Sequence, residues 1–175
     1  MGVMVASAGV HRILVVDDNA AIHRDFQKIL SSSERRADLD DLEKDLFGAD
    51  AVATKSKQYS VACAGSGQEA VKLAQRASQQ GAPFTVAFVD MRMPGWDGIE
   101  TLTQLFRVQP DLQVAICSAY MDYSWAEVLQ RLKRPGLRLL RKPWTSGEVL
   151  ALVHELCGRA AQARQPAPPS RKLSP

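Results

Sequence analysis

The chain has 175 residues, of which 46% are hydrophobic and 23% are charged, and its formal net charge is +3. This length suits one compact domain with additional segments, and the composition is too apolar for a chain that is disordered throughout. Arg164, Arg171 and Lys172, near the C-terminus, account for the whole excess of positive charge. The rest of the chain therefore lacks the basic field expected of a nucleic-acid-binding protein.

The cysteines and the N-terminal residues point to one cellular location. Cys63, Cys117 and Cys157 are widely spaced and form no C-x-x-C pair, which favours a reducing compartment. No run approaches the roughly 20 apolar residues that span a bilayer, and the N-terminus lacks the features of a signal peptide. We predict a cytoplasmic protein without membrane segments, in which residues 1–10 form a flexible N-terminal segment.

Short apolar runs alternate with segments of helical periodicity along the chain. Because the runs are almost continuously hydrophobic, they are typical of parallel strands covered on both faces. Each is followed by apolar residues at helical spacing, beginning with Ile22, Phe26 and Ile29 after the first run. The sequence therefore predicts a doubly wound α/β fold, because parallel neighbouring strands need helical crossovers. The predicted strands cover residues 12–16, 59–64, 84–89, 112–117 and 137–140.

Two helix starts carry a capping box. Ser66 precedes Glu69 by three residues, and Thr145 precedes Glu148 by the same spacing. In such a pair the hydroxyl and the carboxylate each accept from a backbone N–H that would otherwise lack a partner. Helices are expected to begin at both places.

Two segments interrupt the alternation. Residues 31–58 are far longer than a usual helix-to-strand connection of about 2 to 6 residues, and we interpret them as an insertion. Leu39, Leu42, Leu46 and Phe47 predict one amphipathic helix there, which either packs on the body or docks a partner. The Pro-rich residues 164–175 predict an extended tail or linker.

Polar residues follow four of the predicted strands. Asp17 and Asp18 come after the first, Asp90 after the third, Ser118 after the fourth and Lys142 after the fifth. The carboxyl ends of parallel strands share one edge of the sheet, where ligands bind. Three neighbouring carboxylates repel one another unless a cation neutralises them, and Mg²⁺ with its preference for oxygen fits. The sequence predicts a magnesium site that also receives a phosphoryl group.

Each of these residues also has a purely structural explanation. Asp17 and Asp18 suit the cap of a following helix, and Ser118 suits a loop hydroxyl bonded to local backbone. Lys142 alone would be a solvated surface lysine. Asp90 is hardest to explain this way, because an acid that ends an apolar strand needs solvent or a partner.

The motifs Ile-Leu-Val-Val-Asp17-Asp18-Asn19, Phe-Val-Asp90-Met-Arg92-Met-Pro-Gly-Trp-Asp-Gly, Ser118-Ala-Tyr and Arg-Lys142-Pro resemble the receiver domain of two-component response regulators. The resemblance covers roughly residues 11 to 160 and is closest to a subgroup with an insertion between the first helix and second strand. It implies a flavodoxin-like fold with strand order 2-1-3-4-5, an extra inserted helix and a receiver domain at residues 11–163.

The resemblance also implies a role for each site residue. Asp90 would accept a phosphoryl group from a phosphohistidine. Asp18 would bind Mg²⁺ directly, Asp17 would support it partly through water, and the backbone carbonyl of Arg92 would be a further ligand beside Asp90. Lys142 would contact the phosphoryl oxygens.

The remaining switch residues are partly unusual. Ser118 would be the switch hydroxyl, and Pro143 matches the family's cis-proline. The family usually has Phe or Tyr three residues before the lysine, whereas this chain has Leu139. We hypothesise that Tyr120 takes over part of that role and shields the phosphoryl group from water.

The resemblance implies partners as well. A histidine kinase or phosphotransfer protein would be the donor, and a downstream protein or output domain would bind the face formed by residues 123–160, with a homodimer as a further option. No nucleic-acid contact is expected within the chain. The domain would be no enzyme beyond its own phosphorylation and slow autodephosphorylation.

Two other functions are alternatives to the receiver domain. A haloacid dehalogenase-like phosphatase also uses an aspartyl phosphate, but it needs Asp-x-Asp, and here Asn19 and Arg92 stand two residues after Asp17 and Asp90. A dinucleotide-binding module would need a third glycine after Gly65 and Gly67, which the capped start of a helix explains better.

Overall fold

The computed structural model describes residues 10–31, 58–119 and 125–163. The inserted amphipathic helix, the Pro-rich tail, Tyr120 and nearly all of the predicted N-terminal segment lie outside the described residues. Val10, predicted as the end of that segment, is the first residue of the first strand.

The centre of the fold is a parallel sheet of five strands in the order β2-β1-β3-β4-β5. Every predicted strand is present, with ends shifted by no more than two residues. This confirms the flavodoxin-like architecture. The strands are β1 (Val10–Val16), β2 (Gln58–Ala64), β3 (Val86–Asp90), β4 (Gln113–Ser118) and β5 (Arg138–Arg141).

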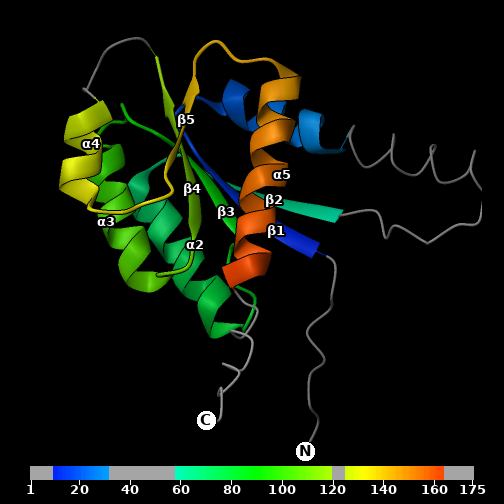
Figure 1. The fold of residues 1–175 in the computed structure, drawn as a ribbon, viewed down its shortest axis with the longest axis horizontal. Coiled ribbons are helices and arrows are strands. Elements are labelled where there is room, and N and C mark those ends of the chain that lie inside the picture. The colour runs from blue at the N-terminus through cyan, green and yellow to red at the C-terminus, as the bar shows by residue number, and fades with distance from the viewer. Residues whose placement is uncertain (1–9, 32–57, 120–124, 164–175) are drawn as a thin grey trace, which may run out of the picture.

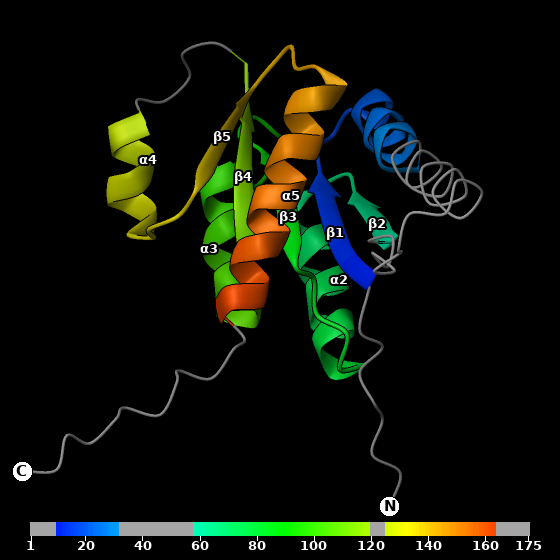
Figure 2. The same ribbon diagram turned by 45° about the vertical axis from the view of Figure 1, so that its right-hand side comes forward.

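Helices cover both faces of the sheet (Figures 1 and 2). One face carries α2 (Gly67–Gln79), α3 (Gly98–Val108) and α4 (Trp125–Leu132). The other carries α5 (Ser146–Ala163) and the helix that follows β1, which is helical over residues 20–31. No helix among the described residues is long and apolar enough to cross a membrane.

The alternation of side chains along the strands divides the core in two. In β1, Leu14 and Val16 join the core under α2 and α3, whereas Ile13 and Val15 join the core under α5 and the helix at 20–31. All four side chains are almost completely buried. This is why the strand reads as a continuous hydrophobic run instead of an alternating one.

Both predicted caps are present, in slightly different forms. Thr145 and Glu148 form a reciprocal box, with Glu148 N–H donating to Thr145 Oγ1 at 3.3 Å and Thr145 N–H donating to Glu148 Oε2 at 2.7 Å. At α2, Ser66 Oγ accepts from Glu69 N–H at 3.3 Å, but the Glu69 carboxylate accepts from Gly65 N–H at 2.8 Å. The Glu69 carboxylate therefore ties Gly65, the residue after β2, to the first turn of α2.

The start of α3 is held close to the end of β3. Asp97 caps the helix by accepting from Glu100 N–H at 2.8 Å, and Gly98 N–H donates to the carbonyl of Met91 at 3.1 Å. A Cβ atom at Gly98 would lie 2.7 Å from the carbonyl oxygen of Asp90. Only glycine allows this approach, so Gly98 fixes the path of the loop that follows Asp90.

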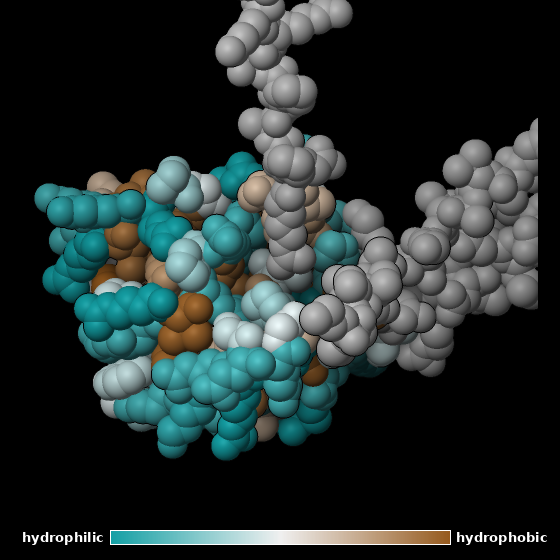
Figure 3. All heavy atoms as spheres, turned by 90° about the horizontal axis from the view of Figure 1, so that it is seen from below, coloured by the Kyte–Doolittle hydropathy of each residue, from teal (hydrophilic) through white to brown (hydrophobic). Residues whose placement is uncertain are grey.

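A buried glutamine joins three elements at the amino-terminal edge of the sheet. The side chain of Gln109 accepts from Phe84 N–H at 3.2 Å and donates to the carbonyl of Ala74 at 3.1 Å and the hydroxyl of Ser78 at 3.0 Å. It lies 5% exposed. Seen from this end, the described part of the molecule presents mainly hydrophilic side chains with smaller hydrophobic areas between them (Figure 3).

Candidate functional site

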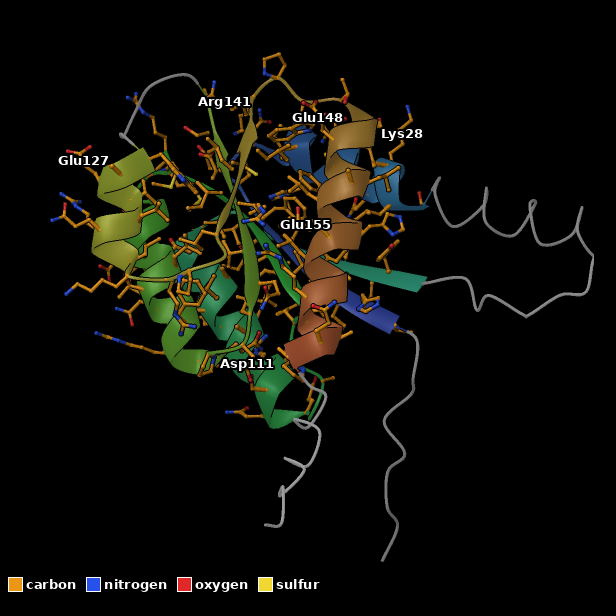
Figure 4. All side chains as sticks on the ribbon, in the orientation of Figure 1. Lys28, Asp111, Glu127, Arg141, Glu148 and Glu155 are labelled. Carbon is orange, nitrogen blue, oxygen red and sulfur yellow. The ribbon has the colours of Figure 1, made fainter. Side chains whose placement is uncertain are left out.

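The register of the sheet brings three predicted site residues to one edge and one face. Asp17 follows Val16 of β1 directly, Asp90 ends β3, and Lys142 follows Arg141 of β5. These residues continue the alternation whose other members pack under α5 and the helix at 20–31. In Figure 4, Arg141 marks this edge at the top, and Asp111 marks the opposite edge below.

Lys142 bridges the two acids. Its Nζ lies 2.7 Å from Asp17 Oδ2 and 2.7 Å from Asp90 Oδ1. Asp17 is 2% exposed and Asp90 is 6% exposed, so both carboxylates are removed from solvent at the sheet edge. One ammonium thus faces two carboxylates, and their cluster carries a net negative charge.

Backbone amides stabilise the remaining carboxylate oxygens. Arg92 N–H donates to Asp90 Oδ2 at 3.0 Å, and Asn19 N–H donates to Asp17 Oδ1 at 2.9 Å. Each amide lies two residues after the acid, so the turn that follows each strand orients that strand's own carboxylate. The two side chains are preorganised by local sequence.

Burial and the contacts within the cluster shift the pKa values of Asp90 and Lys142. Burial, and to a smaller extent the charge of Asp17, raises the pKa of Asp90, although its contacts with Lys142 act in the opposite direction. Burial alone would lower the pKa of Lys142, but the hydrogen bonds that its ammonium donates to both carboxylates raise it. Lys142 therefore stays charged, and burial disfavours the ionised form of Asp90.

Two predicted residues lie differently. Asp18 is exposed, unlike Asp17. Ser118 is half-buried, and its hydroxyl donates to the carbonyl of Ala119 at 2.8 Å. The backbone still ties Ser118 to the site, because its carbonyl accepts from Lys142 N–H at 2.9 Å. The switch role of the hydroxyl stays a prediction.

The segment after Lys142 contains a contact that the sequence did not reveal. The Lys142–Pro143 peptide bond is cis, as the resemblance implied. Trp144 follows, and its ring centroid lies 5.7 Å from Lys142 Nζ. The Arg-Lys-Pro-Trp run could have indicated an aromatic ring beside the lysine, but spacing alone does not show where the ring packs.

The donor set suits a hard divalent cation. Asp17 and Asp90 supply buried carboxylate oxygens, and one lysine leaves part of their charge uncompensated. Over the described residues, no group of three or more His, Cys, Asp or Glu side chains is placed to hold a metal ion. The resemblance assigns the remaining protein ligands to Asp18 and to the backbone carbonyl of Arg92. Of the predicted acidic trio, Asp17 and Asp90 lie together at this edge.

The strand order β2-β1-β3-β4-β5 is that of the flavodoxin-like class, in which ligands bind at the carboxyl edge of the sheet, where Asp17, Asp90 and Lys142 lie. Residues 39–154 match the response regulator receiver domain family. The chain belongs to this family. The matched range contains Asp90, Ser118 and Lys142 and begins after Asp17 and Asp18.

A curated relative agrees with this assignment. The chain is 25% identical over 165 residues to the transcriptional regulatory protein AruR of Pseudomonas aeruginosa, an alignment that covers 94% of this chain and 57% of the relative. The chain therefore spans little more than half the length of that protein.

Solved structures share the fold. The receiver domain protein from Clostridium thermocellum has a TM-score of 0.63 at 19% identity, over 87% of this chain and 98% of its own. A CheY-like receiver from Methanospirillum hungatei JF-1 has a TM-score of 0.63 at 18% identity, over 89% and 99%. The CheX-CheY-BeF3-Mg complex from Borrelia burgdorferi has a TM-score of 0.57 at 18% identity, over 83% and 88%.

Proposed function

We propose that Asp90 is the phosphoacceptor of this receiver domain and that Lys142 and Asp17 hold the site in the state that accepts the phosphoryl group. The single observation that carries this proposal is the Lys142 bridge, with both carboxylates 2.7 Å from one ammonium. One cation therefore contacts two buried anions, and part of their negative charge is left unbalanced.

The reaction uses groups that are already in position. Asp90 Oδ1 or Oδ2 attacks the phosphorus of a phosphohistidine, and the new O–P bond forms as the P–N bond breaks. The electron pair stays on the imidazole nitrogen, which binds a proton. Lys142, already beside Asp90, contacts the phosphoryl oxygens and balances part of their added charge.

Mg²⁺ would be held by Asp17, Asp18, Asp90 and the backbone carbonyl of Arg92, and when bound it would neutralise charge on the phosphoryl oxygens. The support for these ligands is the surplus of carboxylate charge at the edge. Asp18, which is exposed, is assigned from the resemblance of the Asp-Asp-Asn motif. Asp17, which would act partly through water, and Asp90 lie together at this edge.

The partners follow from the family. A histidine kinase or phosphotransfer protein supplies the phosphoryl group, and a downstream protein or output domain responds to it. We place the responding surface at residues 123–160, a range that contains α4, β5 and most of α5. Ser118 lies before this range in the sequence, and Lys142 lies within it, between β5 and α5. The protein works in the cytoplasm as a switch, with no turnover of substrate beyond its own phosphorylation and dephosphorylation.

The phosphatase alternative is weaker. A haloacid dehalogenase-like enzyme needs a second carboxylate two residues after the nucleophile, and that position holds Arg92, whose side chain is exposed. Sustained release of phosphate from small phosphate esters would favour the phosphatase.

Intact mass spectrometry tests the proposal. The protein is incubated with acetyl phosphate and Mg²⁺, and uptake of one phosphoryl group is compared among the wild type, Asp90→Asn and the matched control Asp97→Asn. Asp97 caps α3 and lies outside the charge cluster. We expect uptake in the wild type and in Asp97→Asn, but none in Asp90→Asn. Equal uptake by Asp90→Asn would reject Asp90 as the acceptor.

A further inference from the structure

Trp144 stands between the charged site and the buried core. It lies in the short segment between β5 and α5, and it is half-buried. One side of its environment is the ammonium of Lys142, 5.7 Å from the ring centroid. This distance lies within the roughly 6 Å range over which a cation is attracted to the face of an indole.

Trp144 also contacts the buried core. Its ring meets Phe26 edge-on, with centroids 5.6 Å apart and planes at 67°. Phe26, from the helix at 20–31, is 0% exposed, and its ring centroid lies 4.7 Å from that of Phe88. A half-buried tryptophan is therefore held by a fully buried phenylalanine pair, so the position of its ring is set by the core.

A series of side-chain contacts connects Asp90 with another residue of its own strand. Phe88 lies two residues before Asp90 on β3, so the two side chains point to the same face of the sheet. Asp90 contacts Lys142, and Lys142 contacts Trp144. Trp144 in turn contacts Phe26, which contacts Phe88 on the same strand as Asp90.

Lysine needs such support more than most residues. Its ammonium ends a flexible chain of four methylenes, and three donors give it little directional preference. The ammonium of Lys142 must contact two carboxylates at once, and the attraction of either carboxylate alone would not hold it in that position. The indole ring of Trp144 gives the ammonium a third contact, beside those with Asp17 and Asp90.

We propose that Trp144 is a positioning residue that holds Lys142 over the Asp17–Asp90 pair and ties the lysine to the helix at 20–31 through Phe26. This inference rests on the proposed function, because it assigns Trp144 a part in the uptake of the phosphoryl group. It also states a physical contact, which has a test of its own.

The kinetic test compares Trp144→Leu with Trp144→Phe. Phenylalanine keeps an aromatic face, whereas leucine fills part of the space without one. We expect the rate constant of phosphorylation by acetyl phosphate to fall about three- to tenfold in Trp144→Leu and less than about twofold in Trp144→Phe. Trp125→Leu is the matched control, because Trp125 is also half-buried but packs in the other core, and its rate should stay within about twofold of the wild type.

A double-mutant cycle separates positioning from general stability. In a Lys142→Ala background, Trp144→Leu should lower the rate no further, because the group that it positions is gone. An equal fold-change in both backgrounds would show a structural role only. It would overturn the proposal, as would a wild-type rate for Trp144→Leu.

The contact itself is tested by NMR of the lysine ammonium groups. The indole ring current should shift the ¹⁵N–¹H signal of Lys142 upfield in the wild type, and the shift should disappear in Trp144→Leu and be largely kept in Trp144→Phe. An unshifted signal in the wild type, or the same shift in Trp144→Leu, would overturn the proposal. If the wild type takes up no phosphoryl group, the proposed function fails, and this signal alone still decides whether Trp144 holds Lys142.

Discussion

The two edges of the sheet treat buried polar groups in opposite ways. At the amino-terminal edge, Gln109 is neutral, and its amide makes three hydrogen bonds to Phe84, Ala74 and Ser78. At the carboxyl-terminal edge, Asp17 and Asp90 share one ammonium. The first edge satisfies its buried groups with neutral partners, whereas the second keeps a surplus of charge. The groups that we propose to react therefore lie at the edge whose buried charge is only partly balanced.

The cations follow the same division. Near the amino-terminal edge, the guanidinium of Arg12 lies 4.9 Å from the ring centroid of Phe84, and that of Arg134 lies 4.4 Å from the ring centroid of Phe106. Both arginines also donate to backbone carbonyls. These cations contact rings and carbonyls, whereas Lys142 contacts two carboxylates as well as a ring. Removing a cation should therefore have very different consequences at the two edges.

The largest effect is expected for Lys142→Met. This variant leaves two buried carboxylates without their cation and should lower the free energy of unfolding at neutral pH by ~3 kcal/mol. Burial already raises the pKa of Asp90, and losing the lysine removes the contacts that lower it, so the variant should regain stability relative to the wild type as pH falls. Urea unfolding at several pH values measures this, with the exposed Lys72→Met as control. A deficit that does not shrink in acid would contradict the expected charge imbalance.

A somewhat smaller loss is expected for Gln109→Ala. It removes the partners of a buried N–H and a buried carbonyl and should cost ~2 kcal/mol, with little dependence on pH. The phosphorylation rate should not change, because the residue lies at the opposite edge. Gln104→Ala in α3, the helix that Gln109 follows, is the control, because the side-chain hydrogen bonds of Gln104 are exposed. A slower phosphorylation in Gln109→Ala would contradict the division between the edges.

Asp90→Asn should stabilise the fold by ~1 kcal/mol at neutral pH, because it removes one of two buried like charges and leaves Lys142 paired with Asp17. The folded-state pKa of Asp90 is raised, so its ionised form weakens the fold. The gain should be full at neutral pH and vanish as pH falls below the ordinary pKa of aspartic acid. Thermal unfolding across this range, with the exposed Asp111→Asn beside it, would refute the sign if the variant were less stable than the wild type.

The smallest effect is expected for Arg134→Met. It removes the contact with Phe106 and a 2.7 Å hydrogen bond to the carbonyl of Pro110 but leaves no carboxylate unpaired, so the loss should be ~0.5 kcal/mol. Chemical denaturation measures it. A loss as large as that of Lys142→Met would contradict the contrast between the edges.

Much of the fold could be predicted from the sequence because local signals and burial agree. Apolar runs such as Ile13–Val16 predicted strands covered on both faces, and the Thr145–Glu148 spacing predicted the cap that the structure contains. At the site, Asp17, Asp90 and Lys142 could be brought together from strand ends alone, since parallel strands share an edge.

The remaining features depend on long-range packing, which leaves weak signals in the sequence. A single Gln109 does not reveal that its partners come from α2 and from the start of the segment leading into β3. Trp144 gives no sign that Phe26 supports it. The direction of the Ser118 hydroxyl is a local choice between neighbouring acceptors, and the spacing of strands does not specify it.

The central claim is that Asp17 and Asp90 together hold uncompensated negative charge at the carboxyl edge. The most direct measurement is the thermal unfolding midpoint of the wild type, Asp17→Asn and Asp90→Asn during a Mg²⁺ titration. We predict a saturable rise in the wild type, because a ligand of the folded state stabilises it, and the loss of most of this rise in both variants. No rise in the wild type, or an equal rise in all three proteins, would contradict the account.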